Sequence, residues 1–233
     1  MRLNKFLSDA GFCSRREADR LIQEGRVTVE GLKAQLGQQV EAGARVEVDG
    51  KLIKKRNRPI LLAVNKPVGV VTTTAQDEPA NIVTYVGYPE RIYPIGRLDK
   101  DSQGLILMTN QGELAEQIAH ARGFHEKEYI VTVDHPVTRE FIEAMGAGVR
   151  LSDRTVTRPC KVVRVSRNRF RIILTQGLNR QIRRMCEALG YKVRELTRIR
   201  IMNITLEDLA LGEYRLIQGD EYEALLAALG MKE

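Results

Sequence analysis

The apolar positions at the start of the chain recur every three or four residues, as they do along one face of a helix. This spacing is held by Leu3, Phe6, Leu7 and Ala10 and ends at Gly11. A second helix is predicted over residues 15–24, because Ser14 and Glu17 stand at the spacing of a capping box and Gly25 follows. Residues 27–29 and 46–48 alternate like short strands, so the first 50 residues predict a small helix-helix-strand module.

A charged segment without apolar periodicity, residues 54–59, separates this module from the rest of the chain. Beyond it, strands are predicted over residues 60–64, 129–133, 162–165, 170–175 and 193–197, and helices over 113–121, 138–145, 180–189 and 221–229. The polar residues 166–169 join two of these strands as a hairpin. Such a succession predicts an α+β domain with a largely antiparallel mixed sheet. We therefore expect one domain over residues 1–50, a linker over 51–59 and a second domain over 60–233.

The charge of the chain is unevenly distributed. The formal net charge is +7, which by itself is only compatible with a polyanionic partner. Between Arg154 and Arg200, however, 14 basic residues face two acidic ones, a local charge of +12. A solvated helix face would mix both signs, so this stretch predicts a surface that faces phosphates.

Several classes of protein are disfavoured by what the sequence lacks. Cys13, Cys160 and Cys186 are far apart and odd in number, which is typical of reduced thiols in a cytosolic protein. Neither the cysteines nor the histidines show a metal-binding spacing, and there is no nicotinamide or phosphate loop, so we expect no metal and no cofactor. No apolar run approaches the roughly 18 residues that cross a membrane. We expect a cytoplasmic monomer that does not bind membranes.

The candidate chemistry lies in residues 96–105, GRLDKDSQGL, where one carboxylate, Asp99, stands in a polar turn before an apolar run. The spacing of Asp99, Asp101 and Gly104 imitates the start of a calcium loop, but position 12 would be Asn110 instead of the glutamate that the ion needs. An ordinary loop with turn-capping aspartates is a second interpretation. A catalytic carboxylate is the third.

The same ten residues resemble the catalytic motif of RNA pseudouridine synthases, in which a hydroxyl residue and a glycine follow the aspartate, as Ser102 and Gly104 do here. Residues 65–73, 126–129 and 177–185 resemble three further motifs of that family. The first 50 residues resemble an S4 RNA-binding domain, although their acidic residues leave a plain solvated helix pair open on charge alone. The whole chain is similar to the RsuA/RluB/RluE/RluF family and looks closest to its branch for large-subunit ribosomal RNA.

This resemblance implies roles for particular residues. Asp99 would be the catalytic residue, Tyr129 would hold the target base, and Arg183 would form a salt bridge with Asp99. Contacts with RNA are implied for Arg97, Asn65, Lys66, Arg180, Gln181 and Arg184 in the second domain, and for Lys5, Arg15, Arg16 and Arg20 in the first. Related lineages carry histidine in place of Arg180, so its contacts cannot be transferred, and Arg184 is an alternative to Arg183.

The local pattern adds a prediction about the helix at residues 180–189. If Asn179 caps it, then Ile182, Met185 and Leu189 lie on its buried side. The arginines between them would then point elsewhere, toward the catalytic carboxylate or the RNA.

The expected function is the isomerisation of a uridine to pseudouridine in structured RNA, most simply 23S ribosomal RNA or its precursor particle, with transfer RNA also open. The uridine must be flipped out of a helix before a carboxylate can reach it. Two other functions remain: a catalytically silent RNA-binding or ribosome-assembly factor, and a metal-dependent nuclease that uses Asp99 and Asp101. The nuclease lacks a convincing second group of carboxylates.

Overall fold

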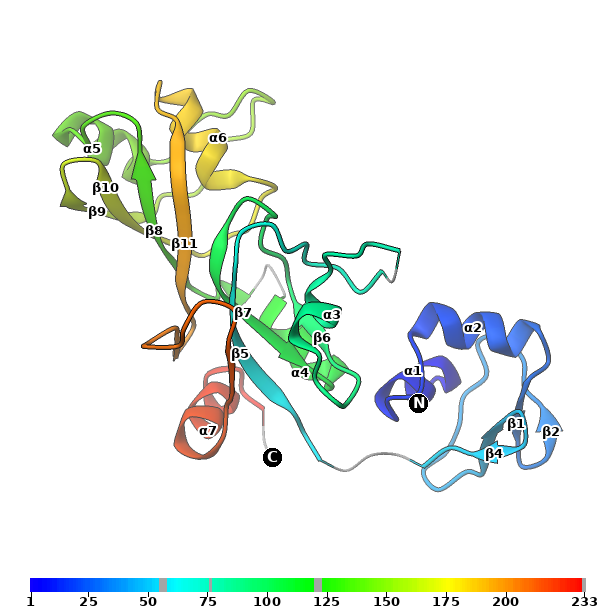
Figure 1. The fold of residues 1–233 in the computed structure, drawn as a ribbon. Coiled ribbons are helices and arrows are strands. Elements are labelled where there is room, and N and C mark those ends of the chain that lie inside the picture. The colour runs from blue at the N-terminus through cyan, green and yellow to red at the C-terminus, as the bar shows by residue number, and fades with distance from the viewer. Residues whose placement is uncertain (55–57, 76, 120–122, 232–233) are drawn as a thin grey trace. The chain divides into compact units, whose positions relative to one another are not determined.

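A computed structural model of the protein describes residues 1–54, 58–75, 77–119 and 123–231. Its backbone contacts divide the chain into two compact units (Figure 1). One unit holds Met1–Ile60, Tyr88–Ile92 and Asn110–Gly112, and the other holds Leu61–Gly87, Tyr93–Thr109 and Glu113–Glu233. The predicted domain limits stay a prediction, and the middle of the predicted linker, residues 55–57, lies outside the described residues.

The first unit packs two helices on a small antiparallel sheet. Helices α1 (Leu3–Asp9) and α2 (Arg15–Gln23) confirm the predicted pair, and the Oγ of Ser14 accepts the amide of Glu17 at 3.1 Å. The sheet has the order β2-β1-β3-β4, with β1 at Val27–Val29, β2 at Leu32–Lys33, β3 at Val46–Val48 and β4 at Lys51–Leu52. Strand β4 was not predicted, and it places two residues of the expected linker in this sheet.

The second unit is built on a sheet of nine strands with the path β13-β5-β7-β11-β8-β10-β9, while β6 pairs with β7 and β12 with β11. Their bounds are β5 Leu61–Lys66, β6 Tyr93–Ile95, β7 Gln103–Thr109, β8 Lys127–Val133, β9 Lys161–Ser166, β10 Arg169–Leu174, β11 Val193–Ile201, β12 Ile204–Thr205 and β13 Tyr214–Leu216. The pair β7–β11 is parallel, and the other pairs between these strands are antiparallel. The expected α+β fold with a largely antiparallel mixed sheet is confirmed.

Helices cover this sheet at both ends (Figure 1). Their bounds are α3 Ile82–Val86, α4 Gly112–Ala119, α5 Arg139–Ala147, α6 Gln181–Ala188 and α7 Gly219–Ala228. One apolar core joins α5 and α6 to β8 and β10 through residues such as Phe141, Met185 and Phe170. A second core joins α4 and α7 to β5 and β7 through residues such as Leu114, Leu225 and Leu107.

The end of the helix predicted over 113–121 falls on residues outside the described part of the chain. Among the described helices, none has the length and apolar character needed to cross a lipid bilayer.

Candidate active site

The parallel pair β7–β11 forms the seam between the two halves of the second unit's sheet. A cavity of about 450 Å³ opens beside this seam, between residues of both apolar cores, such as Ile118 and Ile201 on one side and Leu98 and Leu196 on the other. This volume suits a small organic group such as a nucleoside. Of the predicted site residues, the cavity is lined by Arg97, Asp99, Tyr129, Arg180, Gln181 and Arg183.

The loop that carries Asp99 is held in place through its backbone carbonyls. The hydroxyl of Thr72 donates to the carbonyl of Leu98 at 2.7 Å, and the amide of Gly69 donates to the carbonyl of Lys100 at 2.8 Å. Gly69 has φ +94°, a conformation that side chains rarely tolerate. Residues 67–69 thus form a Pro-Gly turn behind the loop. The clamping role of Thr72 was not foreseen, because Thr72 and Leu98 lie 26 residues apart.

Asp99 is the single carboxylate that lines the cavity, within the part of the chain that the structure describes. Its side chain is 35% exposed, and its Oδ2 lies 3.8 Å from Nη1 of Arg180. Five cationic side chains line the same cavity: Arg97, Lys127, Arg180, Arg183 and Arg198. Asp99 thus faces several positive charges across the cavity, and these charges also attract an anionic ligand such as a nucleotide.

The predicted salt bridge between Arg183 and Asp99 is wrong, because Arg183 is bound to the neighbouring acid. Its Nε lies 3.3 Å from Oδ2 of Asp101, and its Nη2 donates to the carbonyl of Asp101 at 2.7 Å and to Oγ of Ser102 at 3.2 Å. Arg180 also binds Asp101, through two hydrogen bonds of 3.0 and 2.8 Å. The hydrogen bonds from Arg180 lower the pKa of Asp101 most, and the charge of Arg183 adds to this effect.

The predicted cap of helix α6 is also wrong. The residue before the helix is Arg180, in the left-handed conformation with φ 48° and ψ 36°, and it makes no side-chain cap. Instead, Oε1 of Gln181 accepts the amide of Leu178 at 3.1 Å. The buried face is as expected, with Ile182 and Met185 in the core and Leu189 partly buried against it. Gln181, 4% exposed, therefore orders the cavity wall at the start of the helix.

The RNA contacts predicted for Lys66 and Asn65 are contradicted by their burial. Lys66 is 0% exposed, and its Nζ donates to the carbonyls of Pro67 and Val70 at 2.9 and 2.8 Å. Asn65 is 8% exposed and donates to the carbonyl of Leu209 at 2.8 Å. Both side chains fasten the turn behind the Asp99 loop. Burial lowers the pKa of Lys66 to about 8, with a smaller effect from the charge of Arg198.

Of Tyr129 and Arg184, Tyr129 lines the cavity and Arg184 does not. Tyr129, on β8, is 9% exposed and lines the cavity with Asp99. Arg184 is paired with Asp153 at 2.6 Å and is not among the lining residues. Within α6, Arg183 therefore lies closer to the predicted chemistry than its alternative.

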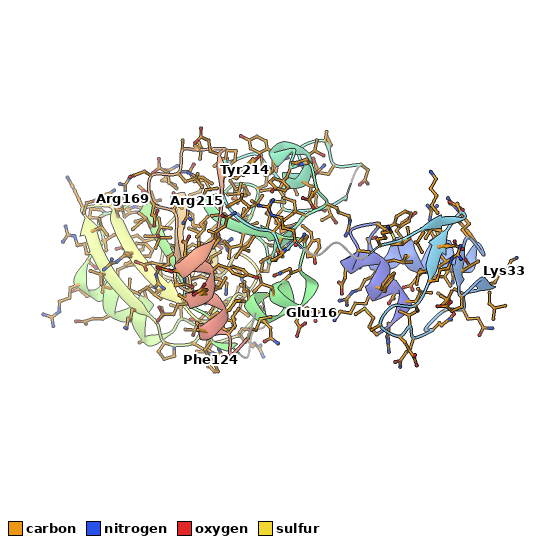
Figure 2. All side chains as sticks on the ribbon, turned by 90° about the horizontal axis from the view of Figure 1, so that it is seen from below. Lys33, Glu116, Phe124, Arg169, Tyr214 and Arg215 are labelled. Carbon is orange, nitrogen blue, oxygen red and sulfur yellow. The ribbon has the colours of Figure 1, made fainter. Side chains whose placement is uncertain are left out.

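The basic stretch 154–200 is divided by the fold. Ten of its basic side chains are exposed, among them Arg169, which Figure 2 labels on β10. Arg198, by contrast, is 3% exposed, and Arg200 pairs with Glu126 and Glu128 at 2.9 and 2.7 Å. The interpretation of the whole stretch as a phosphate-facing surface is wrong for these two residues, which sequence counting could not separate from their neighbours.

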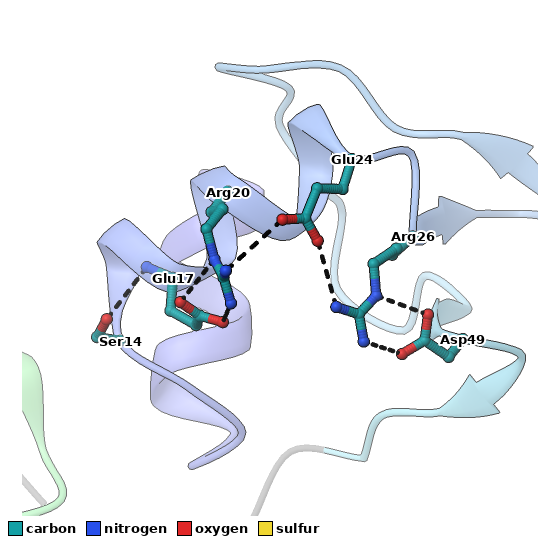
Figure 3. A network of polar contacts seen from close by, with 6 residues as sticks. All are labelled: Ser14, Glu17, Arg20, Glu24, Arg26 and Asp49. Atoms are coloured by element: carbon teal, nitrogen blue, oxygen red, sulfur yellow. Dashed lines mark hydrogen bonds and ion pairs between the residues drawn. The ribbon is translucent and has the colours of Figure 1, made fainter. Parts of the chain in front are cut away.

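In the first unit, the predicted RNA contacts lie on or beside α2 and α1. Arg15 and Arg16 are exposed and Lys5 is partly exposed. Arg20 takes part in a chain of ion pairs that runs from Glu17 and Glu24 through Arg26 to Asp49 (Figure 3). The side chain of Arg20 is still 60% exposed, and exposed ion pairs are weak because water screens them, so a phosphate can compete for it.

In residues 1–54, 58–75, 77–119 and 123–231, no group of three or more His, Cys, Asp or Glu side chains is arranged to hold a metal ion. Asp99 and Asp101 stand two residues apart, but Asp101 is directed to α6 by Arg180 and Arg183. The cavity thus presents one carboxylate, one tyrosine and several cations.

A fold of this kind with this site defines a class of RNA-modifying enzymes, and comparison with known proteins agrees. The family model described as RNA pseudouridylate synthase matches residues 60–188, and the S4 domain model matches residues 1–46. The chain belongs to the RNA pseudouridine synthase family, in the branch that combines this catalytic domain with an S4 domain.

Individual relatives agree with this assignment. The chain is 55% identical to the dual-specificity RNA pseudouridine synthase RluF of Salmonella typhi, over 94% of this chain and 76% of the relative. It is 34% identical to the ribosomal large subunit pseudouridine synthase B of Bacillus subtilis, over 97% of this chain and 96% of the relative. A crystal structure of a pseudouridylate synthase superimposes with a TM-score of 0.70 at 28% identity, over 97% of this chain and 99% of that one.

Proposed function

We propose that this RNA pseudouridine synthase uses Asp99 as its catalytic residue and that its substrate is a uridine of 23S ribosomal RNA. The observation that carries the proposal is the cavity beside the β7–β11 seam, in which Asp99 is the single carboxylate among the described lining residues. Its position in the motif that resembles the family's catalytic sequence supports the same role.

The chemistry of the isomerisation defines what the cavity has to supply. The N1–C1′ bond of uridine breaks, the uracil turns within the site, and a C5–C1′ bond forms. The proton on C5 then leaves and N1 gains one, so that no atoms are gained or lost overall. These reaction steps require an anion beside the ribose, an aromatic face for the turning base and exclusion of water.

The lining residues match these requirements one by one. Asp99 supplies the anion and forms an ion pair with Arg180 at 3.8 Å. Tyr129 supplies an aromatic ring on a rigid strand in the same cavity. Arg183 holds the loop through the carbonyl of Asp101 and the hydroxyl of Ser102, which limits the positions that Asp99 can adopt.

The choice of RNA rests on the names of the relatives and on the exposed basic residues. The B. subtilis relative is named for the large ribosomal subunit, and the S. typhi relative is named for dual specificity. A second substrate therefore belongs to the proposal, and transfer RNA is the class that we expect. A ribosomal substrate implies a cytoplasmic enzyme, and we predict that it acts as a monomer.

The first prediction tests the catalytic role. Asp99→Asn keeps the side-chain volume but removes the charge, so turnover should fall by about 10³-fold or more. RNA affinity should stay within a few fold, because phosphate contacts carry most of it. Turnover is measured as tritium released from RNA labelled at uridine C5, and affinity by filter binding.

Asp208→Asn is the matched control, because Asp208 is an exposed carboxylate that does not line the cavity. It should leave turnover unchanged. If purified Asp99→Asn protein released tritium at the wild-type rate, another residue would perform the chemistry. Mapping pseudouridines in total RNA from a strain that lacks the gene identifies the substrate. If 23S ribosomal RNA from that strain kept all of its pseudouridines, that part of the proposal would be overturned.

A further inference from the structure

Arg198 is a buried cation without an acidic partner. Arg198 is 3% exposed, and no carboxylate in the described part of the chain lies within ion-pair distance of its guanidinium. Its Nη2 is buried and makes no hydrogen bond. A guanidinium stays charged at any pH that proteins tolerate, and an isolated buried charge is costly. The fold therefore tolerates a considerable cost at this position.

The hydrogen bonds of Arg198 reach both ends of the loop that carries Asp99. Its Nε donates to the carbonyl of Leu105 at 2.6 Å, and its Nη1 lies 3.4 Å from the carbonyl of Arg97. Arg97 precedes Asp99 in the loop, and Leu105 lies on β7, just beyond the other end of the loop. Together with the bonds from Thr72 and Gly69, they hold the loop against β11 and against the segment that follows β5.

The charge of Arg198 is also less compensated than the charges of Arg180 and Arg183, which line the same cavity. Arg180 and Arg183 both bind Asp101, which neutralises part of their charge. Arg198 lines the cavity with Asp99, and its charge lowers the pKa of Lys66 and of Lys127, in each case after the larger effect of burial. The influence of this cation thus extends to neighbours on β5 and β8.

We propose that Arg198 is a positioning residue for the isomerisation: it fixes the chain on both sides of Asp99 and supplies a buried positive charge that no carboxylate in the described part of the chain neutralises. The role originally expected of Arg183 is in this way divided, with Arg183 holding the middle of the loop and Arg198 its ends. This inference rests on the proposed catalytic role of Asp99.

The test compares Arg198→Lys, which keeps the charge, with Arg198→Gln, which keeps a hydrogen-bond donor but removes the charge. Single-turnover rates at saturating RNA should fall by about 10²-fold for Arg198→Gln, because a small displacement of a catalytic group has an effect of this size. Arg198→Lys should keep a rate about tenfold above that of Arg198→Gln. RNA affinity should change little in both, since the side chain is buried.

Arg139→Gln is the matched control, because Arg139 is an exposed arginine on α5 that pairs with Glu143 and does not line the cavity. It should leave both the saturated rate and the RNA affinity unchanged. Thermal melting of each variant sets a temperature at which all are folded. If Arg198→Gln does not fold, Arg198→Lys decides, because one ammonium cannot replace both hydrogen bonds and its rate should still fall below that of wild type.

Two outcomes would overturn the inference: a wild-type rate in either folded Arg198 variant, or equal rates in the two. The Asp99→Asn protein, assayed alongside, separates this failure from that of the proposed function. An inactive Asp99→Asn protein with a normal Arg198→Gln rate removes the role of Arg198 alone. An active Asp99→Asn protein removes the proposed function as well.

Discussion

Among single residues, Lys66 illustrates how a basic side chain near a nucleic-acid site can serve the fold instead of the ligand. Its ammonium is fully buried and donates to two carbonyls of the turn that follows it. Burial and, to a smaller extent, the charge of the nearby Arg198 lower its pKa to about 8, while the charges of Asp101 and Asp99 act in the opposite direction. The folded state therefore releases this proton at a lower pH than the unfolded chain.

A dependence of stability on pH follows from this shift. Between about pH 8 and 10.5 the unfolded chain binds more protons at Lys66 than the folded chain, so the unfolding free energy rises with pH in this range. The contribution of Lys66 to stability is therefore fully present above pH 10.5 and is lost as the pH falls through 8. The unfolding free energy of wild type should therefore rise relative to that of Lys66→Met as pH increases, by at most about 3 kcal/mol. Urea denaturation at pH 7, 9 and 10 measures it. A difference that does not vary with pH would contradict the prediction.

At the level of elements, the parallel contact between β7 and β11 decides where the cavity lies. Register pairs Gly104 with Arg198, and the two backbones approach closely there. A Cβ on Gly104 would lie 2.3 Å from the carbonyl oxygen of Arg198, and its φ of +105° is one that other residues rarely adopt. The second glycine of the GRLDKDSQGL motif is thus required by the pairing of two strands, beyond any role in the turn.

Gly104→Ala should therefore destabilise the second unit strongly, by more than about 3 kcal/mol, because the methyl group meets backbone atoms that cannot move aside independently. The midpoint of urea denaturation, followed by circular dichroism, measures the effect. Gly177→Ala is the control, because a Cβ at Gly177 has no neighbour within 4 Å. Equal stability of the two variants would show that β7 and β11 can separate without cost.

For the whole molecule, the main feature is that the first unit has an apolar core of its own. Its buried members all lie between Leu3 and Val48, and none of them belongs to the two cores of the second unit. Strand β4 pairs with β3, so the sheet of this unit continues to Leu52. A core that is complete within one unit is expected to fold without the other.

Removal of residues 1–54, which takes β4 away with the rest of its sheet, should leave a second unit that melts cooperatively. Binding to a large ribosomal RNA fragment should weaken by about tenfold or more, because the S4 domain raises the effective concentration of the catalytic domain on the RNA. Turnover of a short stem-loop should change much less. Calorimetry and filter binding measure both effects, and an insoluble or non-cooperative fragment would show that the two units depend on each other.

The local pattern of the sequence was sufficient for most long elements. Apolar spacing, the Ser14 cap and the hairpin at residues 166–169 identified both helices of the first unit and most of the second, because these signals act between residues close in the chain. Strands β2, β4, β6, β12 and β13, of two or three residues each, and helix α3, of five, were not predicted, and such short segments exist only through their partners. The seven-residue strand β7 was also missed, because its sequence showed only an apolar run after the Asp99 turn.

The sequence by itself determined the family, the α+β class and the candidate pair Asp99 and Tyr129, because each depends on residue types at fixed spacings. The tertiary structure alone decided which charge meets which. Arg183 binds Asp101, Lys66 is buried, and Arg198 reaches a loop more than 90 residues away. In the sequence all three are simply basic residues, and nothing next to them in the chain shows which partner they will meet. Their environments differ because burial and ion pairing are set by the packing of distant segments, which no local pattern encodes.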